Sequence, residues 1–147
     1  ISILENAIIH PDQGQIQRDV ILLVGARSQL DLYFYEKIAA IKQQWLGSFT
    51  YLPVLSREAK DSDWEGARGL VTDYLDDHLG NYLDNPLGNK LEELFSHKSS
   101  SKKTILKSAE SYLCGPPSMI DAAIEKLQAK GLSKHKLYFD KFSDQSV

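Results

Sequence analysis

Apolar residues recur along the chain with two different spacings, which predict alternating strands and helices. Apolar runs of strand length occur at residues 20–24, 48–56 and 111–115. The first run has the composition of a strand that is buried on both faces of a parallel sheet. A fourth segment, residues 135–142, alternates apolar and polar positions and predicts a last strand.

Segments with helical spacing separate these strands. Apolar side chains recur three or four positions apart in residues 29–45, and they are Leu30, Phe34, Ile38, Ile41 and Trp45. The same spacing predicts helices at residues 1–10, 69–83 and 116–131, of which the last is closed by Gly131. This order of elements predicts an α/β protein with a doubly wound, Rossmann-like parallel sheet and helices on both faces.

Two features depart from the simple alternation. Residues 84–110 lose the helical spacing and include the sequence "SHKSSSKKT". We interpret them as a flexible insertion within a single domain, residues 1–147, although their basic side chains could instead dock an acidic partner. Pro53 lies inside a predicted strand, and because proline cannot donate a hydrogen bond to a neighbouring strand, it predicts an edge position.

The composition excludes several classes of protein. A formal net charge of −3 provides no basic surface for nucleic acids. No apolar run approaches the roughly 20 residues that cross a membrane, and the first residues do not form a signal peptide, so we expect a cytoplasmic protein. One cysteine and four scattered histidines predict neither a disulfide framework nor a metal site.

Candidate binding residues lie at the carboxyl ends of the strands, where sheets of this kind bind their ligands. They are Gly25, Ala26, Arg27, Ser56, Arg57, Cys114, Gly115, Pro116, Pro117 and Phe142. Gly115 leaves the backbone open to a flat ring or a pyrophosphate. The two prolines stiffen the entry to a helix, whose unpaired N–H groups and positive dipole end favour a phosphate.

Each side chain among these candidates also has a plainer interpretation. Cys114 would present a small, uncharged group to a ligand, but an isolated cysteine is more often a small buried hydrophobe. Arg27 could be a solvated surface residue, and Arg57 could lie in a mobile polar loop. Phe142 could pack on the core from the last strand. Spacing alone does not decide between these alternatives.

Five ordered segments resemble the NAD(P)-binding domain of the ferredoxin–NADP reductase superfamily. They are "GARSQLDLYFYEKI", "FTYLPVLS", "DWEGARGLVTDYL", "YLCGPPSMIDAAIEKLQAKG" and "LYFDKF", and they cover nearly the whole chain apart from the insertion. The chain is most similar to the reductase components of bacterial methane, phenol and benzoate oxygenases. The flavin subunit of the sodium-pumping quinone reductase is a near relative.

The resemblance implies a flavin-dependent oxidoreductase. Its members take a hydride from NADH or NADPH onto FAD and pass electrons to an iron–sulfur centre or an oxygenase partner. A different function is compatible with the same fold, namely a non-catalytic nucleotide-binding or protein-interaction domain. A flavin domain and an NADH-dependent loss of flavin colour would favour the enzyme.

The resemblance also implies roles for individual residues. Cys114 would be the catalytic residue and would border the nicotinamide ring together with Gly115. Pro116, Pro117 and Met119 would line the pyrophosphate and the ring. On the adenine-ribose side of the coenzyme would lie Gly25, Ala26 and Arg27, while Phe142 would approach the flavin.

Ser56 and Arg57 bear on the choice of coenzyme. The resemblance places a Ser-Arg pair against the 2′-phosphate of NADP in one branch of the superfamily, and an arginine fork suits a phosphate. That branch has an aromatic partner downstream, where this chain instead has "DWEGARG", the pattern of reductases that use NADH. We therefore favour NADH.

Parts of the family pattern are absent from the sequence. These are a first strand with a "GGTG"-like loop, a flavin-binding barrel domain and a ferredoxin domain with a [2Fe–2S] centre. The chain is therefore expected to be the C-terminal, coenzyme-binding part of a longer flavoprotein. We expect it to lack the first strand of the sheet and to be inactive as an isolated fragment.

Overall fold

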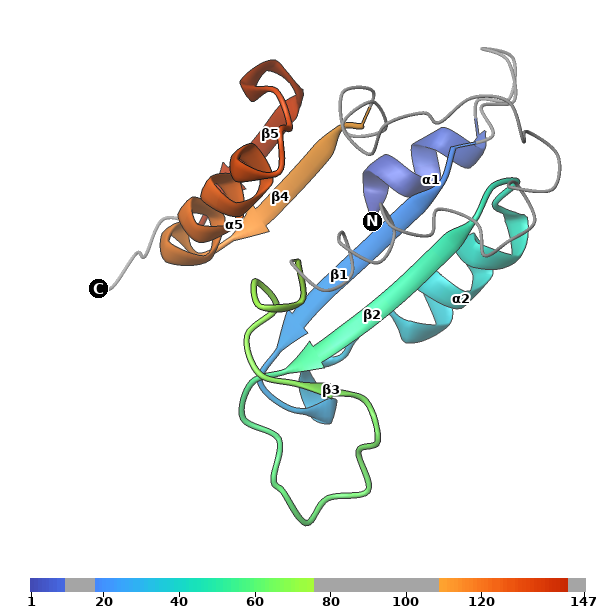
Figure 1. The fold of residues 1–147 in the computed structure, drawn as a ribbon. Helices are drawn as coiled ribbons and strands as arrows, with labels where there is room; N and C mark the ends of the chain where they lie inside the picture. The colour runs from blue at the N-terminus through green and yellow to red at the C-terminus, as the bar shows by residue number, and fades with distance from the viewer. Residues whose placement is uncertain (10–17, 76–108, 143–147) are drawn as a thin grey trace, which may run out of the picture. The chain divides into compact units, whose positions relative to one another are not determined.

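The computed structural model describes residues 1–9, 18–75 and 109–142. The chain forms two compact units, Ile1–Val71 and Thr72–Val147. Each contains parallel strands and at least one helix in its described part (Figure 1). The predicted α/β class with parallel strands is therefore confirmed, with two sheets in the described residues.

The first unit contains a three-stranded parallel sheet in the order β1-β2-β3. The strands are β1 (Val20–Ala26), β2 (Phe49–Leu55) and β3 (Ala67–Arg68). Strands β1 and β2 pair along their whole length, from Val20 opposite Phe49 to Ala26 opposite Leu55. Their carboxyl ends therefore lie at the same edge of the sheet.

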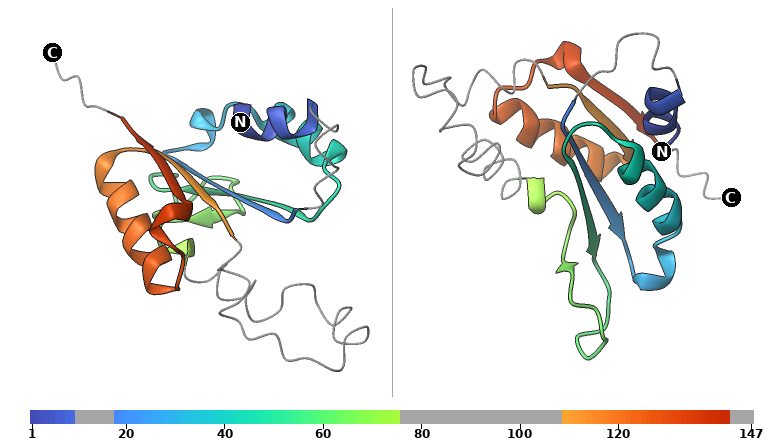
Figure 2. Two further views of the ribbon diagram at one scale, coloured as in Figure 1. Left: turned by 90° about the horizontal axis from the view of Figure 1, so that it is seen from above. Right: turned by 90° about the vertical axis from the view of Figure 1, so that its right-hand side faces the viewer.

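Two helices, α1 (Ser2–Ile9) and α2 (Tyr35–Gln44), cover one face of this sheet (Figure 2). The core between them centres on Ile38, Ile41 and Phe49, which are almost fully buried. Partly buried residues from α1, β1 and β2 complete it, and they include Ile1, Leu4, Ile8, Val20, Leu22 and Tyr51. The predicted apolar stripe of the first helix is confirmed by these contacts.

The predicted helix over residues 29–45 is wrong in its first turn. A short 3₁₀ helix occupies Gln29–Asp31, and α2 begins at Tyr35. Asp31 closes the turn by accepting hydrogen bonds from the amide and hydroxyl of Ser28, at 2.9 and 3.0 Å. Phe34 has a φ of 75°, which no α-helix contains. Leu30 is consequently 96% exposed and takes no part in the core.

Two predictions about the strands are also wrong. Strand β2 is the middle strand of the described sheet, because the short strand β3, which the sequence did not predict, pairs with Val54 and Leu55. The amide of Ser56 points to β1, and backbone amides alternate sides along a strand, so the nitrogen of Pro53 points to the side of β3. Because β3 pairs only from Val54 onward, the missing N–H of Pro53 costs no hydrogen bond to β3. Most residues of β1 are half-buried, so this strand is not buried on both faces.

The second unit contains a two-stranded parallel sheet formed by β4 (Ser111–Gly115) and β5 (Leu137–Lys141). Helix α5 (Pro117–Ala129) lies on it, and Leu127, Leu132 and Leu137 form the buried core. The helix ends in a Schellman motif: the amide of Leu132 donates to the carbonyl of Leu127, and the amide of Gly131 donates to that of Gln128. The predicted stop at Gly131 is confirmed.

Several predicted segments lie outside the described residues. These are most of the helix over 69–83, nearly all of the insertion at 84–110, and the turn that follows α1. Within the described part of the chain, no helix is long and apolar enough to cross a membrane. The same residues contain no group of three or more acidic, histidine or cysteine side chains that could hold a metal ion.

Candidate functional site

The candidate residues divide between the two units, and in each unit they meet where parallel strands end. Gly25, Ala26, Arg27, Ser56 and Arg57 belong to the first unit. The second unit contains Cys114, Gly115, Pro116, Pro117, Met119 and Phe142. Within each unit, backbone hydrogen bonds bring together the strand ends that carry these residues.

In the first unit, the ends of β1 and β2 are joined beyond the last paired residues. The amide of Ser56 donates to the carbonyl of Ala26 at 2.9 Å, and the amide of Arg57 donates to the carbonyl of Arg27 at 2.8 Å. The Ser56 hydroxyl donates to the same Ala26 oxygen at 3.2 Å. The two arginines therefore leave adjacent, fixed points of the backbone.

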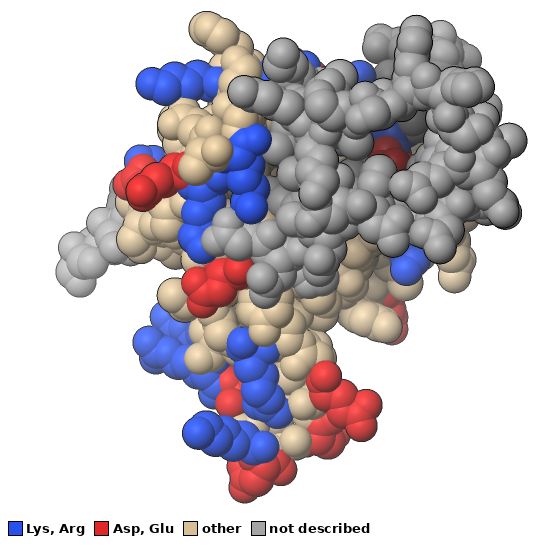
Figure 3. All heavy atoms as spheres, viewed as in Figure 1, with Lys and Arg blue, Asp and Glu red and all other residues tan. Residues whose placement is uncertain are grey.

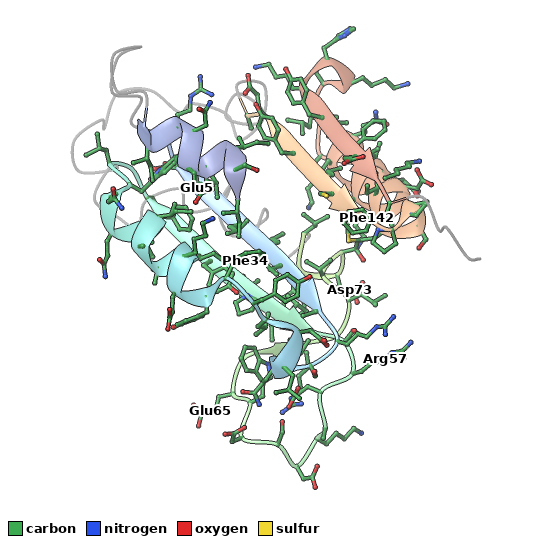
Figure 4. All side chains as sticks on the ribbon, turned by 180° about the vertical axis from the view of Figure 1, so that it is seen from behind. Glu5, Phe34, Arg57, Glu65, Asp73 and Phe142 are labelled. Atoms are coloured by element: carbon green, nitrogen blue, oxygen red, sulfur yellow. The ribbon has the colours of Figure 1, made fainter. Side chains whose placement is uncertain are left out.

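The side chains of Arg27 and Arg57 are exposed. Neither guanidinium has a hydrogen bond or ion pair to another residue in the described parts of the chain. Figure 4 shows Arg57 at the start of the loop that follows β2, with its side chain directed away from the ribbon. Both cations are therefore available to an anionic ligand.

Gly25 serves packing rather than ligand access in this structure. A Cβ atom built on it would lie 3.1 Å from both Cβ and Cγ1 of Val71, which is tighter than an ordinary contact. The residue is extended within β1. Its small size lets the segment after β3 approach the strand closely.

A polar network that the sequence did not predict holds the β2–β3 loop. The guanidinium of Arg68 donates to four acceptors in that loop: Nη1 to the carbonyls of Glu58 and Ala59, at 3.1 and 2.8 Å, and Nη2 to the Ser62 hydroxyl and the Trp64 carbonyl, at 3.2 and 2.9 Å. The sequence shows Arg68 within "DWEGARG", and nothing in its spacing distinguishes it from a solvated arginine.

Gln29 ties the same loop to the end of β1. Its amide donates to Oε2 of Glu58 at 2.9 Å, and its Nε2 donates to Oε1 of Glu58 at 3.1 Å and to Oδ1 of Asp63 at 2.9 Å. The hydrogen bond from the Gln29 backbone is the main reason that the pKa of Glu58 lies below its ordinary value. The loop is thus fixed from both β1 and β3.

In the second unit, Gly115 is buried at the end of β4 with a φ of 153°, a conformation that favours glycine. A Cβ atom at this position would lie 2.6 Å from Cε and 3.2 Å from Sδ of Met119. The end of the Met119 side chain therefore covers the bare backbone that the sequence suggested would be open. A flat ring that approaches Gly115 from the side of its missing Cβ would have to displace this flexible side chain.

Cys114 and Phe142 flank Gly115 in the sheet. The amide of Phe142 donates to the carbonyl of Gly115 at 2.9 Å, and Cys114 pairs in register with Asp140. The thiol of Cys114 is exposed, so this cysteine is not a buried hydrophobe. Phe142 is 55% exposed, so it does not serve mainly as a core residue either. Both side chains are accessible to a ligand.

The first turn of α5 begins directly after Gly115. Pro116 is the N-cap and Pro117 the first helical residue, and no side chain caps this end of the helix. The amides of Ser118 and Met119 therefore lie in the first turn, where the helix itself offers them no acceptor. Together with the dipole of a 13-residue helix, they favour an anionic group such as a phosphate.

Charged side chains of both signs are interspersed around the β2–β3 loop, at the lower end of the view in Figure 3. Three of the carboxylates accept hydrogen bonds within the structure: Asp31 from Ser28, and Glu58 and Asp63 from Gln29. Among the described candidate residues at the end of β1, Arg27 and Arg57 carry positive charge and form no ion pair within the described segments. The described donor set fits a phosphate-containing ligand rather than a cation.

Comparison with known proteins identifies a family match over most of the chain. A model of the oxidoreductase NAD-binding domain matches residues 2–125. The chain is 36% identical over 130 residues to the xylene/toluene monooxygenase electron transfer component XylA of Pseudomonas putida, with 88% of this chain and 30% of that protein aligned.

A second relative matches in sequence, and a solved structure matches in fold. The chain is 30% identical over 134 residues to DmpP, the reductase component of phenol 2-monooxygenase from Pseudomonas sp. strain CF600, covering 89% of this chain and 30% of that protein. The Amycolatopsis cytochrome P450 reductase GcoB matches in structure with a TM-score of 0.61 at 24% identity, covering 92% of this chain and 32% of that one, which shows the fold. The chain thus spans about one third of these relatives.

Proposed function

Since the chain belongs to the oxidoreductase NAD-binding domain family, we propose that it binds the nicotinamide coenzyme of a flavin-dependent reductase. The reductase would carry electrons from NAD(P)H through FAD to an oxygenase or iron–sulfur partner. One observation carries this proposal: the exposed Cys114 and the exposed ring of Phe142 flank Gly115, whose carbonyl accepts a hydrogen bond from the Phe142 amide. Bound coenzyme and flavin would supply the hydride chemistry itself.

The residues of the second unit would orient the nicotinamide end. Cys114 and Gly115 border the ring, and the amides at the start of α5, behind Pro116 and Pro117, receive the pyrophosphate. Met119 moves away from Gly115 when the ring binds. By fixing the ring at the end of the sheet, these residues would remove much of the orientational freedom that slows hydride transfer.

The residues of the first unit would bind the adenosine end. Arg27 and Arg57 supply free positive charge, while Gly25, Ala26 and Ser56 provide the closely packed backbone from which those side chains project. We propose NADH as the preferred coenzyme, on the basis of the "DWEGARG" sequence after β2. Groups suited to phosphate occur in each unit by itself, which supports a phosphate-containing coenzyme.

The composition of the whole protein is part of the same proposal. Residues 1–147 would be its NAD(P)-binding domain, with residues 84–110 as an insertion, and a flavin domain, with or without a [2Fe–2S] ferredoxin domain, would lie elsewhere in a longer cytoplasmic flavoprotein. In the described residues, β1 and β4 each pair along one edge, which leaves the other edge able to accept another strand. The isolated chain would then not turn over.

Replacement of Cys114 by alanine tests the nicotinamide site. In the flavin-containing reductase that carries this domain, we expect the rate of flavin reduction by NADH to fall at least tenfold, with less than a threefold change in coenzyme affinity. Stopped-flow absorbance measures both quantities, and Cys114→Ser provides the conservative comparison. An unchanged rate would remove Cys114 from the catalytic machinery.

The same preparation separates an enzyme from a non-catalytic domain. A yellow protein whose colour bleaches on addition of NADH supports the reductase. A flavin-containing, full-length protein that neither NADH nor NADPH bleaches would contradict the reductase and favour the nucleotide-binding or interaction domain.

A further inference from the structure

Hydrogen bonds hold the β2–β3 loop on both sides of Ser56 and Arg57, although most of its residues are polar. Ahead of Glu58, the backbone amides of Ser56 and Arg57 donate hydrogen bonds to the carbonyls of Ala26 and Arg27, at the end of β1. From Glu58 onward, the loop is bonded to Gln29 and Arg68. Both residues thus lie between two anchored stretches of chain.

Arg68 contributes most to the second anchor. Its planar guanidinium reaches carbonyl groups of Glu58, Ala59 and Trp64, and the hydroxyl of Ser62, from a position in β3. A lysine at this position would carry one ammonium group at a single point and would not match this spread of acceptors. The loop geometry therefore depends on the shape of the side chain as well as on its charge.

Gln29 supplies the opposing contact. It engages both carboxylate oxygens of Glu58, the residue that follows Arg57, and also reaches Asp63. The carboxylate of Glu58 is consequently turned toward Gln29, which leaves the Arg57 guanidinium without a carboxylate partner among the described residues. A free cation on a fixed backbone is a preorganised binding group, because less side-chain and loop entropy is lost when a ligand binds.

We propose that Arg68, acting with Gln29, is the positioning residue for the adenosine end of the coenzyme: it holds the β2–β3 loop so that Arg57 and Ser56 face the ligand. This inference rests on the proposed coenzyme-binding function. Arg68 itself does not touch the coenzyme, since its guanidinium is occupied by the loop. Its loss would weaken binding without altering hydride transfer.

Arg68→Lys in the full flavin-containing reductase tests the proposal. The KM for the coenzyme that the wild type uses is expected to rise about tenfold, while kcat stays within twofold. The inhibition constant of 5′-AMP, which carries only the adenosine end, should rise by the same factor. The inhibition constant of nicotinamide mononucleotide should not change. Arg18→Lys, which alters a similarly charged residue outside the network, serves as the matched control.

Two results would overturn the proposal. One is an unchanged inhibition constant for 5′-AMP, and the other is a fall in kcat at constant KM, which would place the effect at the nicotinamide end. If Arg68→Lys does not fold, Gln29→Ala removes the opposing contact and is expected to raise the same two constants by a smaller factor. An unchanged 5′-AMP constant in that variant would equally contradict the proposal.

The proposed function can fail independently. A wild-type reductase whose flavin neither coenzyme reduces would contradict the proposed function, and 5′-AMP binding, followed by amide chemical shifts, would still decide the role of Arg68. If 5′-AMP binds to the wild type and its affinity falls about tenfold in Arg68→Lys, the positioning role is supported. Equal binding in both, or no binding to the wild type, contradicts it.

Discussion

Gly115 is the residue at which backbone geometry and the proposed chemistry coincide. Its φ of 153° excludes most side chains, and the end of Met119 occupies the space beside it. The sequence suggested that a glycine at this turn leaves room for a ligand. The structure adds that the room is filled by a flexible thioether, which can change rotamer at low cost.

Gly115→Ala is expected to destabilise the protein by about 1–3 kcal/mol, because it places a side chain at a strained φ and against Met119. Gly131→Ala is the matched control, since Gly131 has a φ of 97° and no atom within 4 Å of a built Cβ, so only the backbone cost remains. That cost is about 1–2 kcal/mol. Chemical denaturation measures both.

Met119→Ala separates the two causes at Gly115. In that background Gly115→Ala should cost less than in the wild type, because the contact with Cε of Met119 has gone while the φ penalty stays. Equal costs in the two backgrounds would mean that the Met119 side chain already moves freely away from Gly115.

The β2–β3 loop is the element in which tertiary contacts most exceed what local sequence suggests. Most of its residues are polar, yet Gln29, in the 3₁₀ helix after β1, and Arg68, in β3, hold it in place. The same contacts lower the pKa of Glu58, first through the Gln29 amide and then through the Gln29 side chain. The ionised carboxylate is thus part of the loop's structure.

This arrangement predicts a pH dependence for the loop. Because the folded-state pKa of Glu58 is depressed, its contribution to stability is fully present above the ordinary glutamate pKa of about 4.3 and is lost as the pH falls toward the lower folded value. Gln29→Ala should move the pKa of Glu58 back toward its ordinary value, as measured by NMR titration of its carboxyl carbon. Gln44→Ala, on α2, is the control, and an unchanged Glu58 pKa in Gln29→Ala would refute the account.

The helices differ in how well their pattern predicted them. Helix α5 begins at Pro117, the second of two prolines, and is closed by Gly131 as expected, since both signals act on the local backbone. The apolar spacing predicted a helix that already included Leu30, but α2 begins at Tyr35. The reason is that Asp31 closes a 3₁₀ turn with Ser28 and Phe34 adopts a positive φ. Spacing of apolar residues does not reveal such competing local hydrogen bonds.

At the scale of the whole molecule, the family assignment and the distribution of the candidate residues lead to a kinetic expectation. The proposed site residues belong to two units, and those that we propose for the adenosine end are residues of the first. Changes there should therefore act on coenzyme affinity and selectivity, while changes at Cys114 should act on the rate of flavin reduction.

A preference for one coenzyme is expected of the complete reductase that we propose. We expect kcat/KM to be at least tenfold higher with NADH than with NADPH, following the "DWEGARG" sequence. Arg57→Ala should lower kcat/KM for NADPH more than for NADH, since a 2′-phosphate makes greater use of a guanidinium than a ribose hydroxyl does. Steady-state kinetics with both coenzymes measure this, and a preference for NADPH would reverse our assignment.

The sequence by itself determined the α/β class, the family, most element positions and the strand ends at which candidate residues meet. The class, the element positions and the strand ends follow from apolar periodicity and from glycine and proline signals, which are local properties of the chain. The family follows from the resemblance of five ordered segments.

Only the tertiary structure decided which groups are free and which are engaged. It placed β2 in the middle of its sheet, covered Gly115 with Met119, exposed Cys114, and assembled the network of Gln29, Glu58 and Arg68. Gln29 and Glu58 are 29 positions apart in the sequence, and no periodicity links such residues. Their hydrogen bonds exist because the ends of β1 and β2 come together and turn the side chains that follow toward each other.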